Sequence, residues 1–297
     1  MSRAIALGFF DGVHKGHAAL LEKAIERAGE TGAVPSVLSF DVHPDTLVFN
    51  RPVSLITDTA GRKEIISRCF GIDDVVFLHF SKSVMRMPWE EFLESIISGL
   101  EVSWIVAGHD FTFGHRGEGN AERLREYCGE RGIGCDIISP VYIEGQIVSS
   151  TCIRSFIEQG DMEKAALYLG HPHCLSDTVR SGFHVGRKMD APTINMIFPK
   201  DVIVPKLGVY ATKVILQEGS EHPAVTNVGV RPTFGEGNEL SVESHLLDWS
   251  GNLYGLVARV DFYSYLRPEI KFEDMEALSE QIRNDTEKTR EFFKTLQ

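Results

Sequence analysis

Two histidines and three glycines stand together in the segment GFFDGVHKGH, which runs from Gly8 to His17. The start of a helix binds anions because its first N–H groups have no acceptors within the helix and the helix dipole is positive there. Glycine lets a ligand approach the backbone, and His14 and His17 can add two donors. Together with Asp11, this pattern favours a site for nucleotide phosphates. A tight loop with incidental histidines is the alternative.

A second group of polar residues, SSTCIR, spans Ser149 to Arg154. Ser150 and Thr151 would place hydroxyl groups at a helix N-terminus, and Arg154 would add a guanidinium fork suited to a phosphate. The same residues also suit a plain helix cap, in which a hydroxyl accepts from the first N–H groups. The segment therefore suggests a second phosphate contact without requiring one.

The elements that would position these residues alternate between strands and helices through the first half of the chain. The apolar run before His14 reads as a buried strand, and Leu21, Ala24, Ile25 and Ala28 after it fall on one helical face. Alternation of this kind predicts a parallel sheet covered on both faces. Strands are expected over 4–10, 34–40, 74–80, 103–111 and 135–141, and helices near 60–70, 88–98 and 120–132.

Ligands bind beyond the carboxyl ends of the strands in such a sheet. The segments FDVHP (Phe40 to Pro44), GHDFTFGHRGEGN (Gly108 to Asn120) and SSTCIR each follow a predicted strand. FDVHP by itself is equally well explained as a plain turn. The shared position of the three segments at one sheet edge favours a function for them.

The second half of the chain has a β pattern from about Ser176. Four segments separated by Gly, Pro and Asn turns read as strands, and in the last one Leu256, Ala258, Val260 and Phe262 alternate with more polar residues. This pattern predicts a small antiparallel barrel, followed by a helix from about Glu273. The expected domains are therefore residues 1–172 and 173–297.

Composition limits the class of protein. A chain of 297 residues with 43% hydrophobic residues is long and apolar enough to form two domains, each with its own core. Its net charge of -12 argues against a large nucleic-acid footprint. No apolar run approaches the roughly 20 residues that span a bilayer, and no signal-peptide pattern follows Met1. The five cysteines lack paired spacing, so we expect reduced, mostly buried thiols. We also expect a cytoplasmic protein that is a monomer or weak homo-oligomer.

The motifs taken together resemble a known family. GFFDGVHKGH with SSTCIR looks like the nucleotidyltransferase signature. Combined with PTIN, NVGVRPTF, SVESHLLD, LYG and LRPEIKF, it is similar to the prokaryotic bifunctional riboflavin kinase/FMN adenylyltransferase family. The resemblance covers nearly the whole chain. It implies an N-terminal Rossmann-like nucleotidyltransferase domain and a C-terminal riboflavin kinase-like β-barrel with a terminal helix.

For the first domain the resemblance implies that the phosphate of FMN attacks the α-phosphate of ATP, giving FAD and pyrophosphate. Such a reaction needs positioning and charge stabilisation more than a nucleophile on the protein. The implied catalytic residues are His14, His17 and Arg154, with backbone N–H groups at Gly16 and His17 as further donors. The implied ATP-binding residues are Gly8, Phe9, Asp11, Gly16, Ser150 and Thr151. Flavin and nucleotide positioning falls to His43, Pro44, Asp110, Phe111 and Phe113, although core packing explains the two phenylalanines equally well.

For the second domain the resemblance implies transfer of the γ-phosphate of ATP to the 5′-hydroxyl of riboflavin, giving FMN. A hydroxyl nucleophile needs a base, and the loose phosphoryl transition state needs a metal with oxygen ligands. Glu243 matches the family's base, and Thr193 and Asn195 match its ligands for Mg²⁺. Gly186 and Arg187 are implied at the kinase ATP site, and Arg231, Arg267 and Glu269 at the flavin site.

The chain departs from the family in its kinase nucleotide loop, where Asp190 and Ala191 stand in place of Gly and Phe. A carboxylate there would crowd the loop or repel phosphates, so we expect reduced or altered kinase activity. Two alternatives to the two-activity enzyme are therefore an FMN adenylyltransferase whose barrel only binds flavin, and a nucleotidyltransferase for another phosphorylated substrate, such as a pantetheine or a glycerol phosphate. The barrel motifs weigh against the last.

Overall fold

The computed structural model describes residues 1–180, 193–232 and 238–296. The chain forms two compact units, Met1–Ser150 and Thr151–Gln297. The division falls inside a helix, α7 (Ser150–Gln159), and therefore before the domain boundary expected at residue 172. The next helix, α8 (Met162–Leu169), also belongs to the second unit because it packs on two strands of that unit's sheet.

The first unit is built on a five-stranded sheet in which all neighbouring strands are parallel, as the alternating sequence pattern predicts. The strand order is β3-β2-β1-β4-β5. The strands are β1 (Arg3–Leu7), β2 (Val34–Phe40), β3 (Asp74–Leu78), β4 (Val102–Gly108) and β5 (Gly134–Ile138). A two-stranded hairpin, β6 (Tyr142–Ile143) with β7 (Gln146–Ile147), follows.

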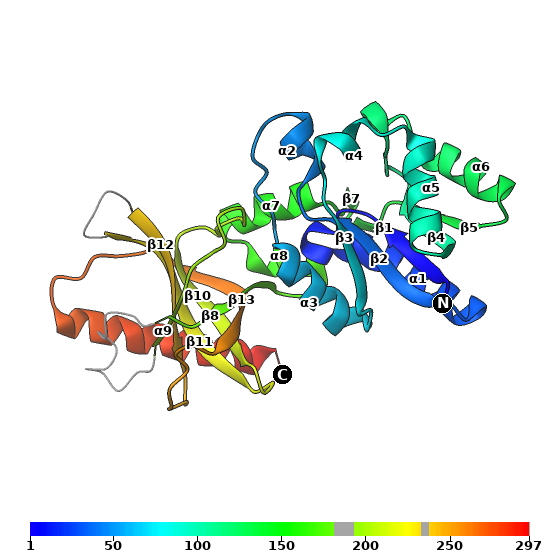
Figure 1. The fold of residues 1–297 in the computed structure, drawn as a ribbon. Helices are drawn as coiled ribbons and strands as arrows, with labels where there is room; N and C mark the ends of the chain where they lie inside the picture. Colours follow the sequence, from blue (N-terminus) through cyan, green and yellow to red (C-terminus); the bar gives the residue numbers. More distant parts are fainter. Residues whose placement is uncertain (181–192, 233–237, 297) are drawn as a thin grey trace. The chain divides into compact units, whose positions relative to one another are not determined.

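Helices cover both faces of this sheet (Figure 1). Helix α1 (Lys15–Thr31) packs on one face, and α5 (Trp89–Gly99) and α6 (Ala121–Glu130) pack on the other, where Ile5 and Leu7 join a core shared with both helices. The remaining helical elements are η1 (Asp11–Val13), α2 (Pro44–Val48), α3 (Thr59–Phe70), α4 (Lys82–Arg86) and η2 (His115–Gly117).

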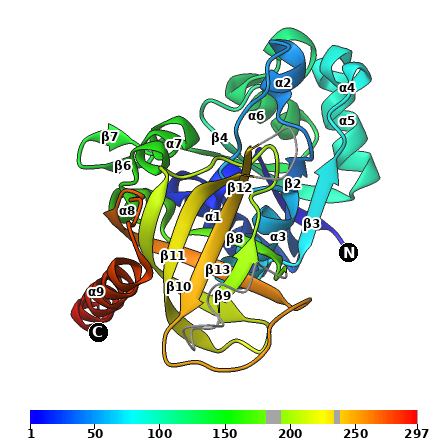
Figure 2. The ribbon, with the colours of Figure 1, turned by 90° about the vertical axis from the view of Figure 1, so that its left-hand side faces the viewer.

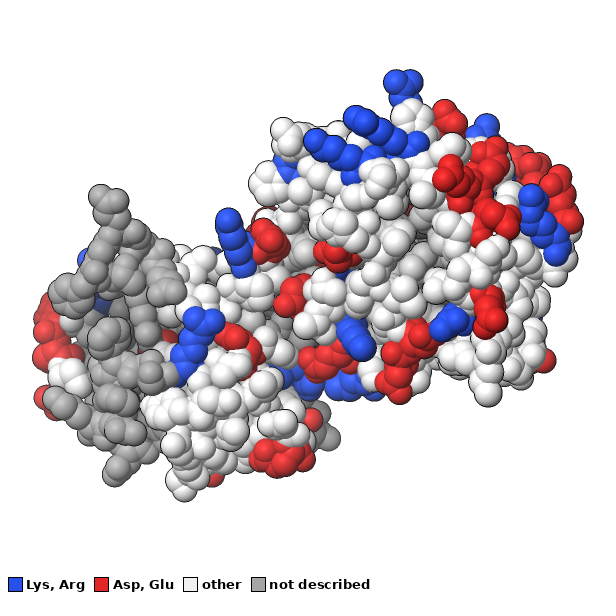
Figure 3. All heavy atoms as spheres, in the orientation of Figure 1, with Lys and Arg blue, Asp and Glu red and all other residues white. Residues whose placement is uncertain are grey.

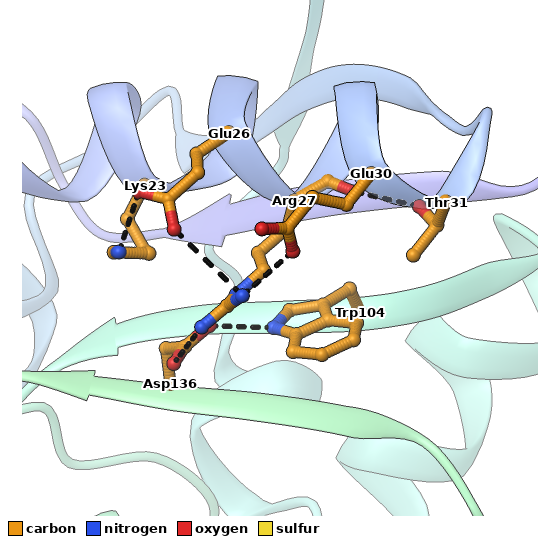
Figure 4. A network of polar contacts seen from close by, with 7 residues as sticks. All are labelled: Lys23, Glu26, Arg27, Glu30, Thr31, Trp104 and Asp136. Carbon is orange, nitrogen blue, oxygen red and sulfur yellow. Dashed lines mark hydrogen bonds and ion pairs between the residues drawn. The ribbon is translucent and has the colours of Figure 1, made fainter.

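A polar network ties α1 to the sheet (Figure 4). Arg27 donates to both carboxylate oxygens of Asp136, at 2.7 and 3.2 Å, and to Glu30 at 2.6 Å. Trp104 donates to the same Asp136 carboxylate at 2.7 Å. The Arg27 and Trp104 hydrogen bonds lower the pKa of Asp136, so its negative charge is well stabilised at neutral pH.

The second unit contains a six-stranded antiparallel sheet in the order β8-β13-β10-β11-β12-β9. It curls until its two edge strands approach each other, since the amide of Arg180 donates to the carbonyl of Asn195 at 2.9 Å. The predicted small barrel is therefore present (Figure 2). Its strands are β8 (His173–Thr178), β9 (Thr193–Met196), β10 (Gly208–Leu216), β11 (Glu221–Pro232), β12 (Asn238–Leu246) and β13 (Val257–Arg267).

The last strand and the terminal helix confirm most of the sequence expectation. Ala258, Val260 and Phe262 are buried, whereas Leu256 lies just before β13 and is exposed. Helix α9 (Met275–Thr295) begins after Asp274, whose carboxylate accepts from the Ala277 amide as an N-cap. The helix packs on β10 and β11.

The thiols are less uniformly buried than expected. Cys128 and Cys174 are buried, Cys135 and Cys152 are half-buried, and Cys69 is exposed. Among the described residues, no helix is long and apolar enough to cross a membrane.

Candidate active sites

The first site lies between β1 and β4, where the order of the strands in the parallel sheet reverses. Strand β1 is followed by β2 on one side, whereas its other neighbour, β4, comes much later in the sequence. Ligands of doubly wound sheets bind at the carboxyl ends of such a strand pair. The loop Gly8–His17 follows β1 and the loop Gly108–Asn120 follows β4, so both predicted clusters reach this edge.

The loop after β1 is held in a strained conformation. Phe10 and Val13 have positive φ values of 59° and 44°, which are costly for residues with a Cβ, and most so for a β-branched one. Asp11 is 2% exposed, and its Oδ1 accepts from the amides of Ile56 and Thr57 at 2.8 and 3.1 Å. The Asp11 carboxylate thus fixes the loop from within the protein, and its expected part in ATP binding remains a prediction.

His14 and His17 are brought into direct contact. Their rings stack with centroids 3.6 Å apart and planes inclined by 14°. His14 is the N-cap of α1, and its Nδ1 accepts from the His17 amide at 3.2 Å. A neutral His14 must therefore carry its proton on Nε2. The His17 amide thus donates to His14 in this structure, and its expected role as a phosphate donor remains a prediction.

His17 is held in its neutral form. Burial is the main cause that lowers its pKa well below 6.5, and the nearby His14 and Arg62 lower it further. Its Nδ1 is buried and makes no hydrogen bond with any residue that the structure describes. A neutral ring donates one N–H, and it can do so across the whole physiological pH range.

Gly8 and Gly16 lie close to aromatic rings within the loop. A Cβ on Gly16 would lie 3.0 Å from two atoms of the His14 ring, and a Cβ on Gly8 would lie 3.1 Å from the Phe10 ring. Gly16 also contributes to the first turn of α1, where N–H groups lack acceptors within the helix. Both positions thus leave room for the histidine stack and for a ligand near the helix start.

Phe9 joins the loop to the segment after β2. Its ring packs edge-on against His43, with centroids 4.4 Å apart. His43 is the N-cap of α2, where its Nδ1 accepts from the Asp45 amide at 3.2 Å and Pro44 occupies the first turn. The structure therefore brings the predicted residues His43 and Pro44 to the predicted loop.

Arg62 is a residue of this site that the sequence reasoning missed. It lies on α3, is 0% exposed, and donates to the Phe9 carbonyl at 2.7 Å and to the Ser39 hydroxyl at 2.8 Å. Its guanidinium carbon is 4.3 Å from the centre of the Phe9 ring. No sequence motif marks it, because one basic residue in a helix usually lies in solvent.

The residues after β4 divide between surface and core. The Asp110 side chain is 82% exposed, and it stands at the carboxyl edge of the sheet. Phe113 is buried among Trp89, Phe92 and Phe111, which favours core packing as the account of it; its contact with a ligand ring remains a prediction. Phe111 is half-buried and stacks on Phe113 with centroids 5.5 Å apart.

The SSTCIR segment reaches the loop through Ser150. The Ser150 hydroxyl donates to the Asp11 carbonyl at 3.1 Å. Thr151 and Arg154 follow on α7 in the second unit, where Thr151 is exposed and Arg154 is half-buried. Their predicted contacts with ATP remain predictions.

The second site is organised by the register of the barrel strands. Directly opposite residues of an antiparallel sheet lie on the same face. Glu243 on β12 is opposite Asn227 on β11 and Asn195 on β9, and the row continues through β10 to β13. In spatial order it consists of Arg267, Val209, Asn227, Glu243 and Asn195. Thr193 lies on the same face, two residues from Asn195 and opposite His245.

A cavity of about 570 Å³ opens over this face. Its walls combine residues of the row with side chains of α9, and the predicted residues among its lining are Thr193, Glu243, Arg267 and Glu269. Glu269 accepts from the Asn227 side chain at 3.1 Å and occupies the space above Gly229, where a Cβ would lie 2.1 Å from its carboxylate. Such a volume suits a small-molecule ligand.

Arg267 is held by the terminal helix. Its guanidinium donates to Asp285 on α9, with Nε 3.0 Å and Nη2 2.8 Å from Oδ2, and the Asp285 side chain is 2% exposed. The sequence reasoning expected Arg267 to bind flavin. The structure shows Arg267 in a buried ion pair that fastens α9 beside the cavity, and its contact with flavin remains a prediction.

Other predicted residues fall outside the described parts of the chain. Gly186 and Arg187 are among these, as are Asp190 and Ala191, on which the expectation of impaired kinase activity depends. Arg231 is described only by its backbone, which pairs with Glu239 between β11 and β12. Within the described residues, no group of three or more His, Cys, Asp or Glu is placed to hold a metal ion.

Charge is distributed unevenly over the first unit. On the face in Figure 3, basic side chains gather in the region of α2 and α4, and acidic ones gather towards α5 and α6. Lys82 and Arg86 belong to α4. A chain with a net charge of -12 therefore carries local positive charge, which favours approach of an anionic substrate.

Comparison with known proteins identifies two family domains in the chain. A family model described as FAD synthetase matches residues 1–152, and one described as riboflavin kinase matches residues 169–293. Bifunctional riboflavin kinase/FMN adenylyltransferases are similar over nearly the full length. The protein from Listeria monocytogenes is 34% identical, with 100% of this chain and 94% of that protein covered. The protein from Bacillus subtilis is 31% identical, with 98% and 93% covered.

A solved structure shares the arrangement of elements. It is described as a macrolide-efflux protein from Streptococcus pneumoniae, and it matches with a TM-score of 0.85 at 30% identity. The match covers 97% of this chain and 94% of that one. The fold described above is thus found in an experimentally determined relative.

Proposed function

The chain belongs to the bifunctional riboflavin kinase/FMN adenylyltransferase family, and from this premise we propose which residues carry its two reactions. The second unit phosphorylates riboflavin to FMN with ATP, and the first adenylylates FMN to FAD. The observation that carries this conclusion is the presence of both catalytic domains in one chain, since a kinase-like domain follows the FAD synthetase domain at residues 169–293. It favours the two-activity enzyme over both alternatives.

For adenylylation, a phosphate oxygen of FMN attacks the α-phosphorus of ATP as the bond to the β-phosphate oxygen breaks. FMN supplies the nucleophile, so the protein must align the reactants and stabilise the charge that moves onto pyrophosphate. His14 would donate from Nε2, because its Nδ1 accepts from the His17 amide. His17 would donate as a neutral ring. We assign Arg154 to the leaving pyrophosphate and Thr151 to a phosphate oxygen.

The other predicted residues of the first unit would shape the site. Asp11 and Ser150 would act through the loop, since their bonds go to the protein backbone. Gly8 and Gly16 would leave space for ATP, while Phe9 and His43 would form an apolar wall. Pro44, Asp110 and half-buried Phe111 stand at the same sheet edge, where they would contact the nucleotide or the flavin.

For phosphorylation, the 5′-hydroxyl oxygen of riboflavin attacks the γ-phosphorus of ATP and ADP leaves. Glu243 would take the hydroxyl proton, because it lies centrally in the polar row and faces the cavity. Glu269 would contact the flavin from the cavity wall, and Arg231 would contact it from β11. Arg267 would hold α9 beside the cavity in which riboflavin binds. Gly186 and Arg187 remain proposed contacts of the ATP phosphates.

The proposed metal of the kinase is Mg²⁺. Thr193 and Asn195 supply neutral oxygen donors on the face that carries Glu243, and hard cations prefer oxygen. Two protein donors leave the remaining positions to phosphate oxygens and water, which fits the way Mg²⁺ binds nucleotides. When bound, it would neutralise charge on the transferred phosphoryl group.

One assay tests both reactions. The chain is incubated with riboflavin, ATP and Mg²⁺, and FMN and FAD are separated by chromatography. We expect both products from the wild type and FMN without FAD from His17→Ala. Glu243→Ala should form neither product from riboflavin, and should still form FAD when FMN is supplied. FAD formed by the wild type only from supplied FMN would instead support the single-activity alternative. A chain that adenylylates neither riboflavin-derived nor supplied FMN would overturn the proposal.

We also propose that the chain works as a monomer or weak homo-oligomer in the cytoplasm, where the ATP consumed by both reactions is available. Light scattering over a range of protein concentrations tests the first point. A single mass that stays at several times that of one chain on dilution would contradict it.

A further inference from the structure

Arg62 is a buried cation without a nearby counter-charge. Its side chain is 0% exposed. Within the described parts of the chain, no carboxylate oxygen lies within 4.0 Å of its nitrogens, and its Nε makes no hydrogen bond. Its donors reach the Phe9 carbonyl and two hydroxyl oxygens, of Ser39 and Thr59. An unpaired buried charge costs several kcal/mol of stability.

The surrounding charges compensate Arg62 only from a distance. Asp11, Asp58 and Asp41 stabilise its charge. Burial nevertheless outweighs them and lowers the pKa of Arg62 to about 10, so the group remains charged at neutral pH. A cost of this kind that persists in a folded protein often marks a functional site.

Arg62 contacts the part of the phosphate-binding loop that sets its conformation. The Phe9 carbonyl accepts from Arg62 at 2.7 Å and from the Ser39 hydroxyl at 2.8 Å. The next residue, Phe10, has the first positive φ of the loop, and Val13 has the second among its non-glycine residues. Bonds to the Phe9 carbonyl therefore help maintain the strained turn that leads into His14.

His17, on which the charge of Arg62 acts, is neutral and supplies no counter-charge. The buried Nδ1 of His17 makes no hydrogen bond with the described residues, and the positive charge of Arg62 acts on the His17 ring. The start of α1 adds the positive end of a helix dipole. The positive potential beneath this loop thus comes from two protein sources, which a polyphosphate bound at the loop would balance.

We propose that Arg62 is a positioning residue for adenylyl transfer, which holds the loop through the Phe9 carbonyl and whose missing counter-charge is supplied by the triphosphate of bound ATP. The inference rests on the adenylylation assigned to the first unit and goes beyond the residues that the sequence motifs mark. Because Arg62 is fully buried, it acts through the loop and through its electric field.

The test compares Arg62→Met, which removes the charge and keeps an unbranched apolar stem, with Arg62→Lys, which keeps the charge. We expect Arg62→Met to unfold at a temperature no lower than the wild type, because an unpaired buried charge has been removed. Its kcat/KM for FMN adenylylation should fall by roughly a hundredfold, with a raised KM for ATP. Arg62→Lys should retain most of the ATP affinity while losing kcat. Riboflavin phosphorylation should be unchanged in both.

Arg27→Met is the matched control, because Arg27 is ion-paired with Asp136 and Glu30. It should lower the unfolding temperature and leave the KM for ATP unchanged. The proposal is overturned if Arg62→Met adenylylates FMN normally, if it fails to fold, or if Arg62→Lys loses ATP affinity to the same extent as Arg62→Met. If the wild-type chain does not adenylylate FMN, the function proposed for the first unit fails as well. The wild-type assay therefore distinguishes that failure from a failure of the Arg62 proposal alone.

Discussion

The imidazole rings of His14 and His17 stack face to face at the start of α1, with centroids 3.6 Å apart. Two stacked imidazoles in a buried setting repel each other when both are protonated, and Arg62 adds a third positive group. His17 is therefore suited to donate a hydrogen bond to a polyanion as a neutral group. This arrangement separates its role from that of surface histidines, which gain and lose charge near neutral pH.

The first prediction concerns the protonation of His17. Its ring signals in NMR should show no titration as the pH falls from neutral through 6.5, because burial, His14 and Arg62 all disfavour the cation. In a His14→Asn variant the pKa of His17 should rise and still remain below 6.5, since burial is the largest cause. An inflection at or above pH 6.5 in the wild type would contradict this assignment.

The second prediction concerns Gly229. A Cβ at this position would lie 2.1 Å from the Glu269 carboxylate, so Gly229→Ala should push the flexible Glu269 side chain away and break its bond to Asn227. We expect the KM for riboflavin to rise by roughly tenfold, with FMN adenylylation unchanged. Gly129→Ala is the control, since nothing lies within 4 Å of its Cβ position. An unchanged KM in Gly229→Ala would argue against Glu269 as a flavin contact.

The third prediction concerns the attachment of α9. Asp285→Asn removes the buried partner of Arg267 and should lower the free energy of unfolding of the second unit by about 3 kcal/mol, measured by chemical denaturation. Asp248→Asn breaks the more exposed ion pair with Arg290 and should cost under about 1 kcal/mol. Equal effects of the two substitutions would show that the Arg267–Asp285 pair has no special part in holding the helix.

The fourth prediction concerns His173 in the barrel core. Burial lowers its pKa to about 3, and neither ring nitrogen has a hydrogen-bond partner among the described residues. The unfolded chain binds a proton on this histidine below about pH 6.5 whereas the native chain does not, so His173 favours unfolding progressively as the pH falls from 6.5 towards 3. Above pH 6.5 this contribution is absent.

His173→Phe should remove this acid sensitivity, because a phenylalanine ring binds no proton. Its ring can keep the stacking with Phe198 and the contact with Phe262. Hydrogen exchange of the β8 and β13 amides should be slower in the variant at acidic pH, and the difference should nearly vanish at neutral pH. The same difference at every pH would show that packing, and not protonation of His173, determines the effect.

Local patterns in the sequence determined most of the elements and both motif sets. The alternation of buried strands and helices in the first half, and of apolar and polar residues at Ala258 to Phe262, depends on neighbours within a few positions. The loop from Gly8 to His17 could be identified for the same reason, because a strand, glycines and a helix start are adjacent in the chain. The residue types in these segments also carried the family resemblance.

Only the tertiary structure decided which residues far apart in the sequence come together at each site. Arg62 is separated from Phe9 by 53 positions and Ser150 from Asp11 by 139, and strand register alone places Asn195, Glu243 and Asn227 in one row. The burial of Phe113 and the pairing of Arg267 with Asp285 have the same origin. Burial and cross-strand register arise from packing between segments far apart in the chain, so periodicity within one segment carries no information about them.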